Sequence, residues 1–248
     1  MNNKRKLYRT GLFFLMMVFG MSTVYAESKS SVYGLISFVS GDVSVTKNNK
    51  TTRAKLSMKV EEGDVITTKK GLVRIQISDA YICHIEKNTT VTFKKILEKT
   101  NTKSYNMDLH KGQIFSRLIP DKSKPGELVI SSPSVTAGVR GTDFMVSELD
   151  PNEKPSMLEM DKSIPSGVYV SSGSVDVETN TQGGKQKVNV KSGEQATVAP
   201  GQLVKDILDD YVTTKMKILE ELKIQKEFNC KLIEEQKEKN RKMLEEFK

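Results

Sequence analysis

Short runs of alternating side chains, separated by turn residues, fill residues 32–201 of this 248-residue chain. Val43 and Val45 illustrate the period of two, and Val188 and Val190 repeat it near the far end. Val, Ile and Thr dominate these runs, as is typical of strands. The runs lie too close together for the long crossovers that parallel strands need. The pattern therefore predicts a mainly β fold: one all-β domain of short strands, arranged as a sandwich or a short solenoid.

Two polar stretches interrupt the alternating pattern. Residues 98–108 (EKTNTKSYNMD) carry few apolar side chains and are predicted to form a long hairpin connection. Residues 148–166 contain three prolines and several charged residues, which favours an exposed excursion between two strands. A connection of that length is either mobile or a contact surface.

The composition changes after Pro200-Gly201. Residues 202–248 contain no proline and no glycine, and their apolar side chains recur at helical spacing. This segment is predicted to be a long, charged, amphipathic C-terminal helix following the β domain of residues 32–201. The apolar stripe vanishes from Glu234 to Lys242, so the second half is predicted to be solvated and partly frayed. Self-association through this helix as a coiled coil remains an open alternative.

The N-terminus has the pattern of an export signal. A basic segment ends at Arg9, a mostly apolar stretch follows, and Val24-Tyr25-Ala26 provides small residues for cleavage before Glu27. Residues 1–26 are therefore predicted to be a signal peptide, with residues 27–31 as a short polar lead. An uncleaved anchor is the alternative. Because no cysteine lies near the cut, lipid attachment has no thiol, and a periplasmic or otherwise exported protein without a stable membrane span is expected.

Charge and composition narrow the function classes. The chain has 39 basic and 31 acidic side chains, but four of the basic ones lie in residues 1–26, so 35 face 31 in the remainder. That modest excess does not favour nucleic acid as a partner. Two cysteines and two histidines are too few for a zinc finger or a disulfide scaffold, and no metal or cofactor is expected.

The positions of the cysteines and histidines in the sequence do not predict a catalytic Cys–His pair. Cys83 and His84 are neighbours in a strand-like run, so their side chains should point to opposite faces of the sheet. His110 precedes a predicted turn. Cys83 and Cys230 are expected to be two independent structural thiols, with a disulfide between them as the alternative. We expect no catalytic residue and no enzyme.

The stretch SSPSVTAGVRGTDFMVS, residues 131–147, resembles the signature of the FecR family of periplasmic domains. The resemblance rests on a Ser-Pro step, a short connector, an Arg-Gly-Thr triplet and a following phenylalanine, in an order that the segments from Val32 to Gly201 also respect. The motif residues are Pro133, Gly138, Arg140, Gly141, Thr142 and Phe144.

Most of these motif residues are predicted to be structural. Gly138 and Gly141 would permit a positive φ or a close backbone approach at a strand entry. Thr142 and Phe144 should share one face, with Phe144 anchored in the core. Arg140 is expected to bond carbonyls or an acidic loop and so staple the turn, and the alternative is that it binds an anionic ligand.

The resemblance implies a binding function. Classical members are sensors with a cytoplasmic anti-sigma segment, one membrane span and a periplasmic domain that meets an outer-membrane receptor. About ten residues precede the apolar stretch here, so the sigma-factor half of that mechanism is not expected. The sequence predicts an exported, non-enzymatic FecR-domain protein that acts by protein–protein interaction in the cell envelope. The alternative is a module that binds cell-wall glycan or an anionic envelope polymer.

Overall fold

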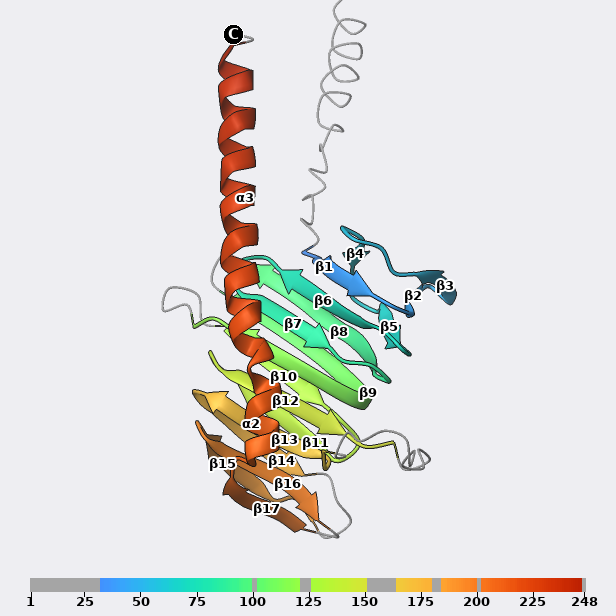
Figure 1. Cartoon of the computed structure of the whole chain (residues 1–248), viewed down its shortest axis with the longest axis vertical. Helices are drawn as coiled ribbons and strands as arrows, with labels where there is room; N and C mark the ends of the chain where they lie inside the picture. The colour runs from blue at the N-terminus through green and yellow to red at the C-terminus, as the bar shows by residue number, and fades with distance from the viewer. Residues whose placement is uncertain are drawn as a thin grey trace, which may run out of the picture. The chain divides into compact units, whose positions relative to one another are not determined.

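Two β-sheets, here called sheet A and sheet B, pack face to face in the computed structural model, and a C-terminal helix lies across sheet A (Figure 1). The structure describes residues 32–99, 102–120, 126–150, 164–179, 184–199 and 202–246. The predicted signal peptide, residues 1–26, and the polar lead, residues 27–31, lie outside the described residues.

Sheet A is antiparallel throughout. Its strands follow the order β4 (Lys59–Val60), β1 (Gly34–Ser40), β6 (Leu72–Ile77), β7 (Tyr81–Ile85), β9 (Thr102–Leu118), β12 (Asp143–Glu148), β13 (Gly167–Ser172), β16 (Glu194–Ala199) and β17 (Gln202–Ile207).

Sheet B shares strand β9 with sheet A and is antiparallel except where β10 pairs with β9. Its strands follow the order β3 (Lys50–Arg53), β2 (Val43–Lys47), β5 (Val65–Thr68), β8 (Thr90–Lys99), β9, β10 (Gly126–Ser131), β11 (Val135–Val139), β14 (Ser174–Thr179) and β15 (Lys187–Lys191).

Strand β9 passes from one sheet to the other at Gly112. Residues 102–109 pair with β8 in sheet B, and residues 112–118 pair with β7 and β12 in sheet A. Gly112 has φ +92°, and a Cβ there would lie 2.2 Å from Thr89 Oγ1. Only glycine fits both conditions, so this residue allows one strand to join the two sheets.

The main core lies between the sheets, where one side of most strands points inward. Val73, Ile75 and Ile77 of β6 are fully buried there, and Cys83 of β7 lies in the same layer. Their neighbours along the strands point to the other side of sheet A. The prediction of a mainly β domain of short strands followed by a long helix is confirmed.

A second, smaller core lies on the outer face of sheet A. Ile82, Phe115, Met145 and Tyr169 project from four neighbouring strands and pack against the C-terminal helices. The helical side of this core comprises Val212, Met216, Leu219 and Leu222. Among the helices that the structure describes, none has both the length and the apolar character needed to cross a membrane.

The C-terminal helix begins later than its sequence pattern predicts. Residues 202–207 form strand β17, whose register with β16 pairs Glu194 with Ile207, so the β domain extends past the predicted boundary at residue 201. Helix α2 (Asp210–Met216) starts after Asp209, which caps it by accepting from the Tyr211 amide, and α3 (Ile218–Glu246) follows. The open edge of β16 offered backbone partners that local helical spacing does not reveal.

The two polar stretches differ from expectation in different ways. Residues 98–99 and 102–108 belong to β8 and β9, which pair as long strands, so the prediction of a long connection over residues 98–108 is wrong. Tyr105 and Met107 supply buried side chains within this segment, and Lys103 is also buried. In the predicted excursion of residues 148–166, β12 ends at Glu148 and β13 begins at Gly167, while residues 151–163 lie outside the described part of the chain.

Candidate functional site

The Arg-Gly-Thr triplet forms a tight turn that enters strand β12. Gly141 has φ +76°, and a Cβ there would lie 2.6 Å from Cβ of Pro120. The Thr142 hydroxyl donates to the carbonyl of Ser174 at 2.9 Å. A Cβ at Gly173 would meet that same hydroxyl oxygen at 2.8 Å. The turn is therefore packed directly against the start of β14.

Some of the other motif residues have the roles predicted for them, and Gly138 does not. Thr142 and Phe144 are both buried, and Phe144 is fully enclosed in the core between the sheets, as expected of an anchor. Gly138 lies within strand β11, where the nearest atom to an added Cβ is the Asp176 carbonyl oxygen at 3.8 Å. Gly138 therefore satisfies neither of the predicted reasons for glycine.

Arg140 is exposed, and it forms no hydrogen bond or ion pair with any other residue that the structure describes. The predicted staple to carbonyls or an acidic loop is therefore not formed within that part of the chain. The side chain borders a shallow hollow of about 430 Å³ over strands β10, β11, β14 and β15 of sheet B.

Paired polar side chains line this hollow. Asn189 donates to Asp176 at 2.9 Å, and Lys187 forms an ion pair with Glu178 at 2.9 Å that lowers the pKa of that carboxyl. The remaining lining residues are Glu127, Val129, Thr136, Gly138, Val139 and Ser174. Arg140 differs from the other charged groups that form pairs here, because its guanidinium keeps its donors available.

Glu148 holds the Ser132-Pro133-Ser134 step. Its carboxylate accepts from the Ser132 hydroxyl at 2.5 Å and from the Ser134 hydroxyl at 2.7 Å, and also from the Ser134 amide at 3.2 Å. The Ser166 hydroxyl donates to it at 3.2 Å. Glu148 lies in sheet A and the serine step joins β10 to β11 of sheet B, so one buried carboxylate ties the sheets together. Sequence reasoning missed this residue.

Arg117 attaches the start of helix α3 to sheet A. One guanidinium nitrogen donates to the Leu219 carbonyl at 2.9 Å, and the other lies 3.3 Å from a carboxylate oxygen of Asp143. Burial raises the pKa of Asp143, and the charge of Arg117 opposes that shift. An arginine with both contacts fixes the helix relative to strands β9 and β12.

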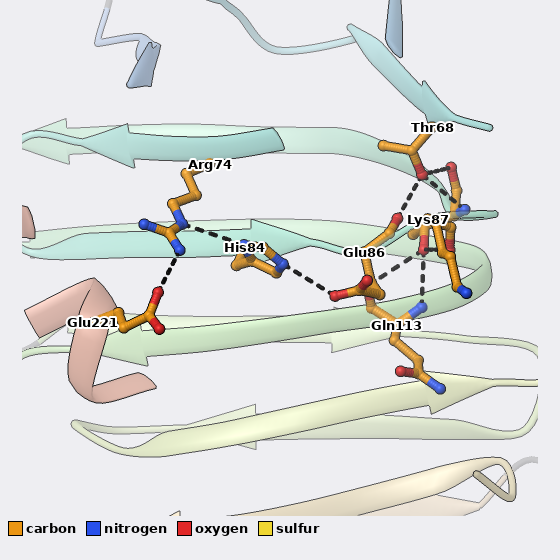
Figure 2. A network of polar contacts seen from close by, with 8 residues as sticks. Thr68, Arg74, His84, Glu86, Lys87, Gln113 and Glu221 are labelled. Atoms are coloured by element: carbon orange, nitrogen blue, oxygen red, sulfur yellow. Dashed lines mark hydrogen bonds and ion pairs between the residues drawn. The ribbon is translucent and has the colours of Figure 1, made fainter. Parts of the chain in front are cut away.

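Arg74 makes the next attachment along the helix (Figure 2). Its guanidinium donates to Glu221 and Gln225 of α3, each at 2.8 Å, while its Nε donates to Nδ1 of His84 at 3.3 Å. The guanidinium also lies 5.3 Å from the ring centroid of Phe38. This one side chain therefore joins α3 to strands β1, β6 and β7.

His84 continues the network away from the helix. Its Nε2 lies 3.1 Å from a carboxylate oxygen of Glu86, and its ring meets Phe115 edge-on with centroids 5.9 Å apart. Because Arg74 can only donate, Nδ1 of His84 is the acceptor, and Nε2 carries the proton that is donated to Glu86. Both ring nitrogens of His84 are thus bonded within the network.

The hydrogen bond from His84 lowers the pKa of Glu86 from its ordinary value of 4.5. A carboxyl with a lowered pKa stabilises the folded state above its unfolded-state pKa, and this stabilisation is lost as the pH falls through its folded-state pKa. We expect Glu86→Gln to cost about 1 kcal/mol near neutral pH and to make the free energy of unfolding less pH-dependent below pH 4.5.

Urea denaturation at a series of pH values from neutral to acidic would measure this difference. Glu62→Gln, at an exposed acid, serves as the control and should keep the wild-type pH dependence. A Glu86→Gln profile parallel to the wild type across the acidic range would contradict the assignment.

Amide side chains extend the attachment to the last helical turn above the sheet. Gln225 donates to the Ser37 carbonyl at 3.4 Å, and Asn229 donates to the Gln76 side-chain oxygen at 2.8 Å. Gln76 in turn donates to Cys230 Sγ at 3.8 Å. The contacts from Leu219 to Cys230 therefore make α3 an integral layer of the β domain, not a loose tail.

The cysteines and histidines lie in four different places. Cys83 is buried between the sheets while His84 faces the helix, which confirms that they point to opposite faces. Burial raises the pKa of Cys83 to about 12, and neither Cys83 nor Cys230 forms a disulfide. His110 bonds the Thr92 hydroxyl at 2.8 Å. Within the described residues, no three metal-binding side chains of His, Cys, Asp or Glu come together.

Comparison with known proteins places the motif in a family. Residues 63–160 match the model of the family described as FecR protein. No curated protein matches the chain.

Two crystal structures of a candidate anti-sigma factor from Parabacteroides distasonis ATCC 8503 are similar to this chain, at 18% and 17% identity and a TM-score of 0.44 each. Each comparison covers 60% of this chain, and the chain spans 62% and 61% of those two structures, less than two thirds of their length. The match over residues 63–160 includes the Arg-Gly-Thr turn and its phenylalanine, so the similarity to the FecR family covers the motif.

Proposed function

We propose that this chain is an exported, non-enzymatic, signalling-related protein whose FecR domain presents helix α3 to a protein partner in the cell envelope. The observation that carries this proposal is an apolar stripe on the solvent side of α3. Ile224, Phe228 and Leu232 follow one another at a spacing of four residues and are 68%, 61% and 47% exposed. Residues at this spacing share one face of a helix.

The attachment of α3 to the sheet makes this stripe suitable for recognition. Leu222 and the helical partners of Arg74 and Arg117 attach α3 to sheet A, so the exposed stripe is held in a fixed orientation. Proteins commonly bind amphipathic helices in apolar grooves through anchors at such positions. Rigid presentation also lowers the entropy lost on binding. The export signal predicted for residues 1–26 supports the envelope as the site of action.

Crosslinking in intact cells would test this function. With a photoreactive residue in place of Lys231, beside the stripe, we expect a specific envelope protein to be crosslinked. A Phe228→Asp substitution in the same chain should reduce the yield about tenfold or more, as expected for loss of a central apolar anchor. Thr214→Asp adds the same charge at an exposed site on α2 and should leave the yield unchanged. Equal yields from both variants would reject the stripe as the recognition surface.

A second candidate function follows from Arg140. An exposed guanidinium without a partner among the described residues, beside a polar hollow, fits an anionic group of an envelope polymer or cell-wall glycan. Co-sedimentation with purified cell wall separates the two functions. Binding at low salt that Arg140→Gln weakens would favour the polymer, and no binding would leave the protein partner as the better proposal.

A further inference from the structure

The face of α3 that docks on sheet A continues beyond the sheet. Eleven residues make three helical turns almost exactly in register, so residues at that spacing share a face. The docked positions Leu222, Gln225 and Asn229 recur eleven residues later as Ile233, Gln236 and Asn240. The chain therefore repeats a docking face where its own sheet no longer lies beneath it.

This second stretch of the face is exposed. Every side chain from Lys231 to Glu245 is exposed, and α3 continues past strand β1 (Figure 1). Four of these side chains are large and apolar: Leu232 and Ile233 are each 47% exposed, Met243 is 55% exposed and Leu244 is 67% exposed. A helical segment this short is marginal without tertiary contacts. Burial of this apolar face against a second surface would stabilise the segment.

The pattern of this face is symmetric about Glu238. Two apolar residues, Leu232 and Ile233, lie at one end, and two more, Met243 and Leu244, lie at the other. Between them lie two amides, Gln236 and Asn240, equally spaced on either side of the midpoint. A sequence that reads alike in both directions complements a second copy of itself laid antiparallel.

We propose that two copies of this chain pair through residues 231–245 as antiparallel helices. Ile233 of each copy then meets Met243 of the other, and Gln236 meets Asn240. Amide side chains both donate and accept, so the two central pairs can bond reciprocally. The contact is isologous, as in a two-fold dimer, where residue i meets j and j meets i.

The position of sheet A selects the antiparallel orientation. The sheet lies on the same side of α3 as this face, and its last contacts with the helix are those of Gln76 with Asn229 and Cys230. In a parallel pair, each sheet would occupy the space that the partner helix needs. In the antiparallel pair, each sheet lies beyond the end of the partner's segment, and the helices meet unobstructed.

The charge of the segment permits this association. Residues 231–245 contain five basic and four acidic side chains, so two copies carry little net charge toward one another. Several of these charges are already paired along the helix, with Arg241 bonded to Glu238 and Glu245. Leu232 lies at the edge of both this face and the stripe of Ile224, Phe228 and Leu232, but Ile233 lies on the side of the helix away from Ile224. The proposal does not depend on the envelope partner.

Sedimentation velocity over a concentration series tests the dimer. The full chain, purified as the cell processes it, is expected to shift from monomer toward dimer as its concentration rises. Ile233→Asp should weaken the dimer at least about tenfold, the effect of placing a charge in an apolar contact. Ile224→Asp, at a more exposed isoleucine on the other side of the helix, should leave the dimer unchanged. A wild-type chain that stays monomeric at concentrations on the order of 100 µM, or equal effects of the two variants, would overturn the proposal.

Disulfide trapping tests the register. In a Cys230→Ser background, one chain carries Gln236→Cys and a second, differently tagged chain carries Asn240→Cys. Mixing them under mild oxidation should give predominantly the mixed 236–240 disulfide, because those positions face each other in the antiparallel pair. Cys83 is buried and stays unreactive. Predominant 236–236 disulfides would indicate a parallel pair, and a dimer whose variants give no disulfide would place the contact elsewhere, so either result would overturn the proposal.

Discussion

Replacing Phe144 with alanine is expected to lower the free energy of unfolding by about 3–5 kcal/mol, the range found when a buried phenylalanine is truncated. Phe144 is fully enclosed between the sheets, on strand β12 near the middle of sheet A. Its strand pairs on both sides, with β9 and β13, so neighbouring backbone cannot easily collapse into the cavity. Little relaxation is therefore available to offset the lost contacts.

Urea denaturation of the wild type and the variant would measure this change. Phe38→Ala is a matched control, because Phe38 is 40% exposed and its ring meets the Arg74 guanidinium from the solvent side. We expect the control to cost about 1 kcal/mol or less, the strength of a partly exposed cation–π contact. Equal losses for the two variants would contradict the assignment of Phe144 as the anchor of the motif.

The alternation of side chains was the most reliable signal in the sequence. It predicted the mainly β domain, and the parity rule correctly assigned Cys83 and His84 to opposite faces of β7. This rule works because the pleat places successive side chains on opposite sides, whatever the rest of the fold does. Thr142 and Phe144, which were predicted to share a face, are both buried.

The alternation rule did not identify the strands that are mostly polar. The segment 98–108 lacks an apolar alternation, yet it pairs along β8 and β9, where Lys103 is buried beside Asp79, the two charges 3.4 Å apart. That pairing, which lowers the pKa of Asp79, bridges residues far apart in the chain. Local composition cannot reveal such a partner. Strand β17 was missed for the related reason that its pairing with β16 outweighs its own helical spacing.

The candidate site was predictable as a motif but not as a set of contacts. The family signature located the Arg-Gly-Thr turn correctly, whereas Arg74 and its partner Glu221 are 147 residues apart in sequence. Glu148 carried a usable signal: a charged residue two positions after Val146 falls on the inward face of its strand. A carboxylate at such a position must find donors, and Ser132 and Ser134 supply them.

Alanine substitutions at the two glycines of the motif are expected to affect stability differently. Gly141→Ala should lower the free energy of unfolding by about 2–5 kcal/mol, since it combines a strained left-handed backbone with overpacking against Pro120. An added Cβ would lie 2.6 Å from a proline carbon, and the proline ring cannot swing aside as a flexible side chain would. Disruption of this turn should also loosen Thr142 from Ser174, because Gly141 sets the position of that hydroxyl.

Gly138→Ala is the control within the same motif. Gly138 lies in a regular strand with 3.8 Å to the nearest atom, so alanine fits and reduces the entropy of the unfolded chain. We expect it to be neutral or to stabilise by about 0.4–1 kcal/mol. Thermal and urea unfolding should therefore show a marked loss of stability for Gly141→Ala and no loss for Gly138→Ala. Similar destabilisation by both would mean that the motif needs glycine for a reason other than backbone conformation, such as the hollow beside Arg140 that the missing side chain leaves open.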